Sequence, residues 1–219
     1  MVIVIGGMIG LGKTTVAEII GKELSLPVYY ESVEGNKVLP LYYTASEEEQ
    51  QKYRYPFLLQ LNFLTTRFHA IKEALLHDNA VLDRSIYEDQ YFASKIHDQG
   101  RMSDLEYSLY CDLLKEMMSE IDGMPKKAPD VMVYLKGTFP TVLKRIKERG
   151  RSFELAPSLV DYYHDLWKDY DEWVFHSYKA SPLLVVDVDQ RDIKENPEDR
   201  KWLLSELDKI YQRLGKKIS

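Results

Sequence analysis

Five short runs of apolar and β-branched residues recur along the chain, and each has the length of a β-strand. Longer segments lie between them, and in these segments the apolar positions follow helical spacing. The runs comprise residues 2–6, 27–31, 80–83, 131–135 and 183–188. Strands that alternate with helices are joined by right-handed crossovers and form a mainly parallel sheet that is buried on both faces. The pattern predicts an α/β fold with a five-stranded parallel sheet flanked by helices.

The length of the chain, 219 residues, is sufficient for a complete hydrophobic core. No internal repeat, low-complexity tract or long linker divides the sequence. We therefore expect residues 1–219 to form a single domain. No segment approaches the roughly eighteen consecutive apolar residues of a membrane span, and Met1 leads directly into VIVIG without a basic region, so we expect neither a span nor an export signal.

The formal net charge is −6 at pH 7, which favours neither a nucleic-acid polymer nor an anionic membrane surface as a partner. Cys111 is the only cysteine, so no intrachain disulfide can form, and the sequence suits a reducing compartment. These features predict a cytoplasmic protein. A small anionic ligand can still be bound locally.

Polar residues gather where three of the predicted strands end. The segment GGMIGLGKTT follows the first strand, Glu31 closes the second, and DRSIYED begins at the end of the third. In open parallel sheets, ligands bind beyond the carboxyl ends of the strands. The three groups are therefore expected to meet at one site.

The first group has the spacing Gly7-x-x-x-x-Gly12-Lys13-Thr14, directly after a strand and at the start of a helix. Successive backbone N–H groups bind phosphate in such a loop, the lysine reaches the outer phosphates, and the threonine hydroxyl can bind Mg²⁺. A dinucleotide-binding turn fits less well, because the third glycine is missing from its offset, and a glycine-rich turn with a solvated lysine is the other alternative. The residues expected to bind ATP here are Gly7, Met8, Ile9, Gly10, Leu11, Gly12, Lys13, Thr14 and Thr15.

The strand ends also supply two carboxylates and an arginine. Glu31 is suited to accept the proton of an attacking hydroxyl, as the base does in phosphoryl transfer. Asp83 is suited to hold Mg²⁺ directly or through water, and Arg84 can neutralise phosphate charge or anchor Glu31. The simpler alternatives are that Glu31 is a solvated acid at a strand end and that Asp83 and Arg84 form a structural ion pair.

The segment PFLLQLNFLTTRF predicts a helix in which Gln60 and Arg67 are seven residues apart and share one face. A glutamine offers a paired donor and acceptor to a base edge, and an arginine offers a planar fork. Hydrogen bonds between helices explain the same residues equally well. Both interpretations stay open at this point.

The run KRIKERGRSFE, at residues 144–154, predicts a helix that breaks at Gly150 into a mobile segment. Arg145 and Arg149 share a face, and Arg151 follows the glycine. Arginines on a closing segment can neutralise a transferring phosphoryl group and exclude water. An ordinary solvated helix end is the alternative to an arginine-rich lid at about 145–157.

Together these residues resemble the deoxyribonucleoside kinase family, in particular its bacterial deoxyadenosine, deoxyguanosine and deoxycytidine kinases. The resemblance is carried by GxxxxGKT, Glu31, the Gln–Arg pair, DRSIYED and RGRSFE, and it extends to about residue 190. It implies a P-loop kinase fold, ATP and Mg²⁺ as cofactors, a deoxynucleoside as substrate, and a homodimer formed through long helices.

The resemblance also implies a role for each matching residue. Glu31 becomes the base that activates the 5′-hydroxyl, with Arg84 beside it and the phosphates. Gln60 and Asp89 read the nucleobase, and Arg67 supports Asp89 and holds it ionised. Glu154 and a tyrosine near position 43, Tyr43, hold the 3′-hydroxyl, while Lys13, Arg145, Arg149 and Arg151 act on the phosphates.

Two positions depart from the family pattern. Asp83 stands where many relatives have glutamate, which shortens the reach to the metal. The aromatic residue that stacks on the base is not fixed by the motif; Phe92 is near, but the alignment after Asp89 can shift by one residue. The identity of the base is therefore the least determined part of the interpretation.

Two other functions are compatible with a phosphate loop. A nucleoside monophosphate kinase resembling thymidylate kinase must clamp an anionic acceptor, usually with an arginine beside the second-strand carboxylate, and YYESVEGN has none. A P-loop switch or ATPase module would leave Gln60, Arg67 and Asp89 unexplained. We therefore expect in-line transfer of a γ-phosphoryl group to the 5′-hydroxyl of deoxyadenosine or deoxyguanosine, with deoxycytidine possible.

Overall fold

The computed structural model describes residues 1–31, 33 and 35–216. Within them, five parallel strands form one sheet in the order β2-β3-β1-β4-β5. The strands are β1 (Val2–Gly7), β2 (Val28–Tyr29), β3 (Ala80–Asp83), β4 (Val131–Lys136) and β5 (Leu183–Asp187). The predicted fold class and the five predicted strand positions are confirmed.

Strand β2 is shorter than the predicted run 27–31. It lies at the edge of the sheet, where its only neighbour is β3, and Tyr29 pairs with Leu82 one residue before β3 ends. The chain therefore leaves the sheet at Tyr30, whose side chain is 56% exposed. Glu31 lies two residues beyond the strand, at the same edge as Asp83.

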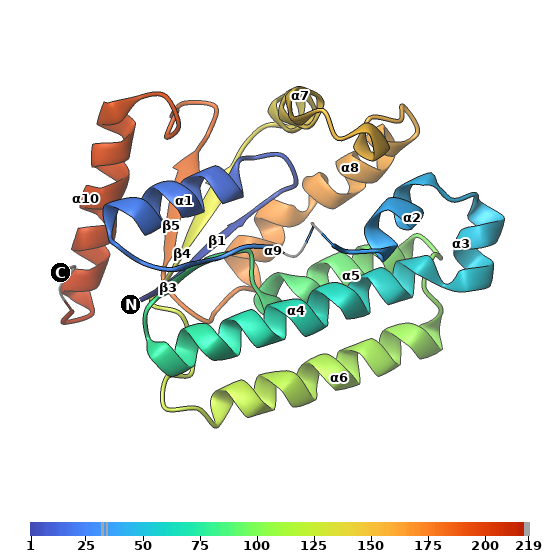
Figure 1. Ribbon diagram of the computed structural model, residues 1–219, viewed down its shortest axis with the longest axis horizontal. Coiled ribbons are helices and arrows are strands. Elements are labelled where there is room, and N and C mark those ends of the chain that lie inside the picture. Colours follow the sequence, from blue (N-terminus) through green and yellow to red (C-terminus); the bar gives the residue numbers. More distant parts are fainter. Residues whose placement is uncertain (32, 34, 217–219) are drawn as a thin grey trace.

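Helices cover both faces of the sheet, and the alternation of side chains along β1 determines which helices each face meets. Ile3 and Ile5 belong to an apolar cluster with residues of α1 (Lys13–Glu23) and α10 (Pro197–Arg213). Val2 and Val4 belong to a second cluster with residues of α4 and α6. Figure 1 shows the bundle of α4, α5 and α6 below the sheet and α1 and α10 beside it. The bounds of the bundle helices are α4 (Tyr55–His77), α5 (Asp89–Asp98) and α6 (Asp104–Asp122).

The remaining helices surround the carboxyl ends of the strands. A third apolar cluster joins α2 to α4 through Leu39, Tyr42 and Leu59. Among the described helices, none combines the length and apolar character that crossing a membrane requires. The remaining elements are α2 (Val38–Thr44), α3 (Glu47–Tyr53), the 3₁₀ turn η1 (Ile86–Glu88), α7 (Phe139–Arg149), the 3₁₀ turn η2 (Ser152–Glu154), α8 (Leu159–Lys168) and α9 (Tyr170–His176).

The loop between β1 and α1 depends on glycine at two positions. Gly10 and Gly12 have φ of 86° and 90°, in the left-handed region that other residues adopt only with strain. A Cβ atom at Gly10 would also lie 2.9 Å from Cγ1 of Ile146 in α7. The loop can therefore turn tightly, and α1 begins at Lys13 with its first N–H groups directed at the carboxyl edge of the sheet.

Candidate active site

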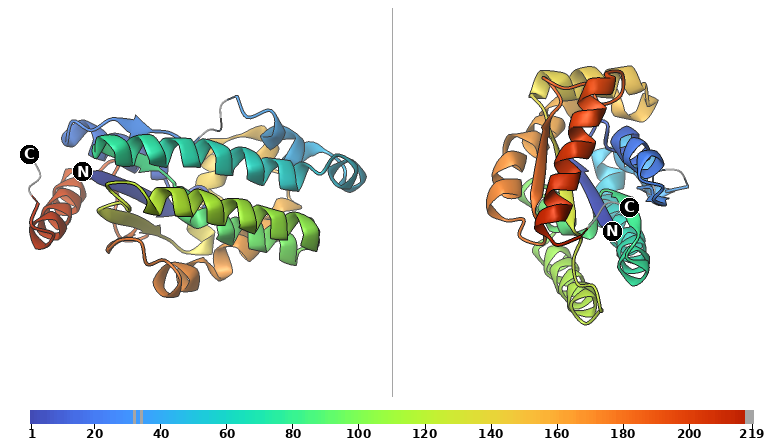
Figure 2. Two further views of the ribbon diagram at one scale, coloured as in Figure 1. Left: turned by 90° about the horizontal axis from the view of Figure 1, so that it is seen from below. Right: turned by 90° about the vertical axis from the view of Figure 1, so that its left-hand side faces the viewer.

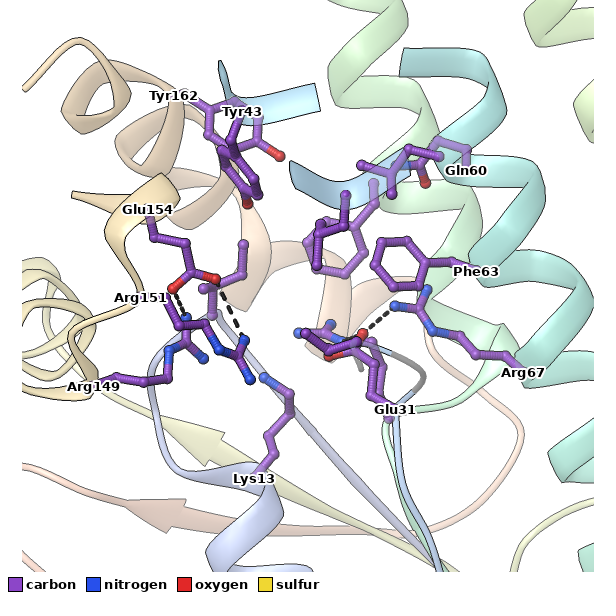
Figure 3. Close-up of a pocket in the computed structure, with 16 residues that line it drawn as sticks. Lys13, Glu31, Tyr43, Gln60, Phe63, Arg67, Arg149, Arg151, Glu154 and Tyr162 are labelled. Atoms are coloured by element: carbon purple, nitrogen blue, oxygen red, sulfur yellow. Dashed lines mark hydrogen bonds and ion pairs between the residues drawn. The ribbon is translucent and has the colours of Figure 1, made fainter. Parts of the chain in front are cut away.

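A cavity lies beyond the carboxyl ends of β1 and β3, between α2, α4 and the segment after α7. Figure 3 shows Lys13 and Glu31 at its base, Gln60 and Arg67 on one wall, and Glu154 on the other. Residues from opposite ends of the sequence therefore meet in one pocket. The sequence-predicted residues that line it are Ile9, Lys13, Glu31, Tyr43, Gln60, Arg67, Arg84, Arg149, Arg151 and Glu154.

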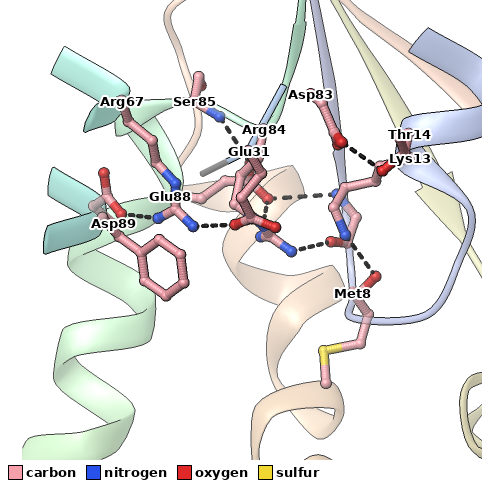
Figure 4. A network of polar contacts seen from close by, with 12 residues as sticks. Met8, Lys13, Thr14, Glu31, Arg67, Asp83, Arg84, Ser85, Glu88 and Asp89 are labelled. Carbon is pink, nitrogen blue, oxygen red and sulfur yellow. Dashed lines mark hydrogen bonds and ion pairs between the residues drawn. The ribbon is translucent and has the colours of Figure 1, made fainter. Parts of the chain in front are cut away.

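Five charged side chains of alternating sign form a row beside this cavity (Figure 4). The middle three line the cavity, whereas Asp89 and Glu88 at the two ends are completely buried and do not. Arg67 donates hydrogen bonds to both Asp89 and Glu31. Arg84 Nε lies 3.1 Å from Glu31 Oε1, and Arg84 Nη1 donates to Glu88 Oε1 at 2.9 Å. The order Asp89–Arg67–Glu31–Arg84–Glu88 gives each arginine two carboxylates, so Glu31 is held between two guanidinium groups.

The position of each carboxylate in this chain determines its protonation. Burial raises the pKa of Glu31, but Arg84, Arg67 and Lys13 together outweigh it and lower the pKa to about 2. Asp89 has only Arg67 as a direct cationic partner, and burial raises its pKa to about 7 against that attraction. Burial of Asp89 therefore opposes the ionisation that Arg67 favours.

The phosphate loop has an ammonium group and a pair of oxygen ligands ready at its end. Lys13 Nζ donates to the carbonyl of Met8 at 3.0 Å, and burial lowers the pKa of Lys13 to about 7. The Thr14 hydroxyl donates to Asp83 Oδ2 at 2.5 Å, while Asp83 Oδ1 is buried without a hydrogen-bond partner in the described residues. A phosphate oxygen would replace the carbonyl as the partner of Lys13.

This donor set fits Mg²⁺. The ion prefers oxygen ligands and usually keeps several waters while binding one or two protein oxygens and the phosphates of its nucleotide. Thr14 and Asp83 present a hydroxyl and a carboxylate side by side, and burial raises the pKa of Asp83, which a nearby cation would reverse. Although Asp83 is shorter than the glutamate that many relatives have at this position, its carboxylate reaches the Thr14 hydroxyl.

A second, larger cavity lies on the other side of Lys13 and Glu31, over the phosphate loop and α7. Arg145 lines this cavity, and it donates to the carbonyl of Leu11 at 2.8 Å and to that of Val188 at 3.3 Å. It is thus fixed to the loop. The residues that line both cavities are Lys13, Glu31, Val33, Arg149 and Arg151. The two spaces meet at the residues expected to act on a phosphoryl group.

The segment after α7 forms the predicted break. Gly150 ends the helix with φ of 71°, in the left-handed region, and the chain then enters η2. Arg149 donates to Glu154, and Arg151 Nη1 lies 3.5 Å from Glu154 Oε1. Phe153 of the same segment stacks on Tyr43 of α2 with ring centroids 5.6 Å apart. Both arginines and the carboxylate expected to bind sugar therefore reach the cavity from one short segment.

The geometry separates the two interpretations of the α4 residues. Arg67 of α4 makes a hydrogen bond between helices, because Asp89 is the first residue of α5, and it also bonds to Glu31. Gln60 Oε1, in contrast, is buried without a partner in the described residues. Asp89 Oδ2 also lacks one. A hydrogen bond between helices does not account for Gln60 here, and its amide oxygen is available to a ligand in the cavity.

Comparison with known proteins identifies the family. A model of the deoxynucleoside kinase family matches residues 3–212. The chain belongs to the deoxynucleoside kinase family. It is 44% identical over 218 residues to the deoxyguanosine kinase of Lactobacillus johnsonii, and the alignment covers 98% of this chain and 94% of that protein. It is 40% identical over 217 residues to the deoxyadenosine kinase of Lactobacillus acidophilus, covering 98% of each.

A solved structure has the same fold. Deoxyadenosine kinase from M. mycoides with bound dATP superimposes with a TM-score of 0.78 at 29% identity, over 94% of this chain and 99% of that one. The P-loop kinase fold and the predicted family are confirmed. The family match decides against a relative of thymidylate kinase and against a switch or ATPase module.

In this family member, sequence reasoning missed part of the cavity wall. Phe63 lies under the guanidinium of Arg67 at 4.6 Å, and it shares the helix face of Gln60, so helical spacing could have indicated it. Phe92 also lines the cavity, with the Arg84 guanidinium 4.6 Å from the centre of its ring. Tyr162 comes from α8, and no local motif signals it.

Loss of Arg67 should destabilise the fold strongly, because it leaves two carboxylates short of a partner in a buried site. We expect Arg67→Met to lower the free energy of unfolding by about 3–5 kcal/mol in urea titrations. Adding Asp89→Asn should recover part of that loss. The control is Lys72→Met, on the same helix as Arg67, which removes an exposed ion pair with Glu120 of α6. It should cost less than about 1 kcal/mol. Equal losses for the two single variants would contradict the argument.

Proposed function

We propose that this kinase transfers the γ-phosphoryl group of ATP to the 5′-hydroxyl of a purine deoxynucleoside, in nucleotide salvage. The observation that carries the proposal is the meeting of two cavities at Lys13 and Glu31. One cavity is narrow and lined by aromatic and polar groups, and the other lies over the phosphate loop. Donor and acceptor would then react where the cavities join.

The proposed chemistry consists of positioning and charge neutralisation. Glu31 accepts the proton of the 5′-hydroxyl, and its low pKa keeps it ionised throughout the neutral range. Lys13, Arg84, Arg149 and Arg151 face the phosphates and neutralise the charge that develops during transfer. With so weak a base, proton transfer follows most of the bond breaking at phosphorus.

The donor is proposed to bind along the phosphate loop from Gly7 to Thr15, with Arg145 closing its outer side. Thr14 and Asp83 would hold Mg²⁺, which supplies positive charge to the donor phosphates. We further propose that residues 1–219 act as one catalytic domain in the cytoplasm, with residues 145–157 as its lid. The Gly150 break and the arginines beside it support that assignment.

The acceptor is proposed to lie between Phe63 and Phe92, with its base toward Gln60 and Asp89. Gln60 offers an unpartnered oxygen, and the free oxygen of Asp89 can accept a hydrogen bond from an amine or a ring N–H. These groups suit adenine and guanine, with cytosine possible, and they suit thymine less. The names of the relatives at 44% and 40% identity support the purines. Tyr43 and Glu154 are proposed to hold the 3′-hydroxyl.

The function is tested by assaying the four deoxynucleosides with ATP and Mg²⁺ and scoring the 5′-monophosphates. We expect deoxyadenosine or deoxyguanosine to give the highest kcat/KM. Glu31→Gln keeps the shape of the side chain but removes the proton acceptor, so kcat should fall by about 10²- to 10⁴-fold while the nucleoside still binds. Thymidine as the best substrate would refute the base assignment, and unchanged turnover of Glu31→Gln would refute the role of that residue.

The raised pKa of Asp89 predicts a pH-dependent acceptor affinity. If the carboxylate must be ionised to accept a hydrogen bond from adenine, its ionised fraction falls about tenfold between pH 8 and pH 6 for a pKa of about 7. At saturating ATP, kcat/KM for deoxyadenosine should therefore fall about tenfold over that range. In Asp89→Asn the same profile should be flat and the ranking of the four bases should change. A slope that persists in the variant would assign the titration to another group.

We propose a homodimer that uses the outer face of α6. Leu105, Leu109 and Leu113 are spaced four residues apart, so they form one stripe, and each is exposed. Figure 2 shows α6 at the outside of the molecule beside α4, which exposes Leu58 and Leu76. Helical stripes of this kind pair well with a second copy of themselves.

Light scattering coupled to gel filtration should then give a mass of two chains for the wild type and of one chain for Leu109→Lys. Phe175→Lys changes an exposed apolar residue of α9, outside the stripe, and should leave the dimer intact. A monomeric wild type at micromolar concentration would contradict the proposal.

A further inference from the structure

Glu88 ends the turn η1 and belongs to the segment DRSIYED, yet the proposed reaction gives it no role. Its carboxylate is completely buried, and it does not line either cavity. A buried carboxylate is costly unless cations and hydrogen-bond donors surround it. The donors around Glu88 therefore indicate what the group is for.

These four donors come from three separate segments of the chain. Glu88 Oε1 accepts from Arg84 Nη1 at 2.9 Å, from the backbone N–H of Gly7 at 3.4 Å, and from the Tyr170 hydroxyl. Glu88 Oε2 accepts from the backbone N–H of Ser85 at 3.4 Å. One carboxylate thus joins the first residue of the phosphate loop, the loop after β3, and α9.

The conformation of Arg84 requires such support. Its φ of 72° places a non-glycine residue in the left-handed region. Its backbone N–H donates to Ile5 at 3.0 Å and its Nη2 donates to the carbonyl of Gly7 at 3.1 Å. The guanidinium therefore binds the phosphate loop directly while Nε lies against Glu31. A shift of Arg84 would move both.

We infer that Glu88 and the Tyr170 hydroxyl form a positioning pair that fixes Arg84 and the start of the phosphate loop relative to Glu31. The inference rests on the proposed roles of Arg84 and Glu31. Without Glu88, Glu31 would be the remaining close carboxylate partner of Arg84 among the described residues. Glu88 thus holds Arg84 in place beside Glu31, so that the position of Arg84 does not depend on Glu31 alone.

The chain offers matched controls for both members of the pair. Asp130 is another buried carboxylate, and it accepts from the backbone N–H of Val2 at 2.7 Å, at the opposite end of β1, and pairs with Lys126. Tyr134 is another buried tyrosine whose hydroxyl donates to a carboxylate, that of Asp171. Tyr134 itself pairs with Gly6 and packs on Tyr170, so the tyrosine control is Tyr178, which is buried and whose hydroxyl lies 2.7 Å from Ser181 Oγ before β5 begins. Asp130→Asn and Tyr178→Phe therefore remove a buried carboxylate and a buried tyrosine hydroxyl at the opposite end of the sheet from the phosphate loop.

The test compares Glu88→Gln and Tyr170→Phe with these controls, measuring kcat, KM for the deoxynucleoside, unfolding in urea, and the NMR signal of the Gly7 amide. In Glu88→Gln we expect kcat to fall roughly tenfold to a hundredfold, since small displacements of reacting groups have effects of that size. KM for the deoxynucleoside should change less than threefold, and the Gly7 amide signal should shift. Tyr170→Phe should give a smaller loss, and the double variant should lose no more than Glu88→Gln alone.

The controls should keep wild-type kcat and the Gly7 signal even where they lower stability. An unchanged kcat in folded Glu88→Gln, or losses that follow stability alone across all four variants, would overturn the inference. If Glu88→Gln does not fold, Tyr170→Phe carries the test, and a kcat equal to that of Tyr178→Phe would overturn it. Absence of 5′-kinase activity in the wild type and in Asp130→Asn would instead refute the proposed function.

Discussion

The site depends on placing a carboxylate between two arginines and then supplying each arginine with a second carboxylate. Glu31 could not stay ionised and buried alone, because removing a charge from water costs several kcal/mol unless partners surround it. Arg67 and Arg84 satisfy that requirement, and Asp89 and Glu88 balance their excess charge. The result is a row of alternating charges at the carboxyl-terminal edge of the sheet.

The sheet makes that line possible because its strand order brings distant segments to one edge. β3 lies between β2 and β1, so the residues after β2 and β3 and the loop after β1 emerge side by side. Arg84 links them physically, since its backbone bonds to Ile5 and its side chain reaches Glu31. The fold and the electrostatics of the site are therefore specified by the same few contacts.

Much of this arrangement could be predicted from sequence, because strands, helix faces and the phosphate loop have local signatures. Gln60 and Arg67 follow from helical spacing, and the positions of Glu31 and Asp83 follow from strand ends. The raised pKa of Asp89 could not be predicted, because it depends on the tertiary packing that buries this carboxylate completely beside Arg67 of α4. Tyr162 and Tyr170 were missed for the same reason: only tertiary packing brings α8 and α9 to the site.

The pairing of Glu154 with Arg149 and Arg151, the arginines of the proposed lid, has a consequence for the competing transfer of the phosphoryl group to water. Glu154 is 4% exposed and pairs with both Arg149 and Arg151. In the proposed mechanism the same carboxylate binds the sugar, so a nucleoside that enters competes for its oxygens and loosens its hold on the guanidinium groups. A water molecule has no sugar hydroxyl and would not compete for the oxygens of Glu154. In that mechanism one carboxylate, shared between the sugar and the two arginines, would limit hydrolysis of the donor by water.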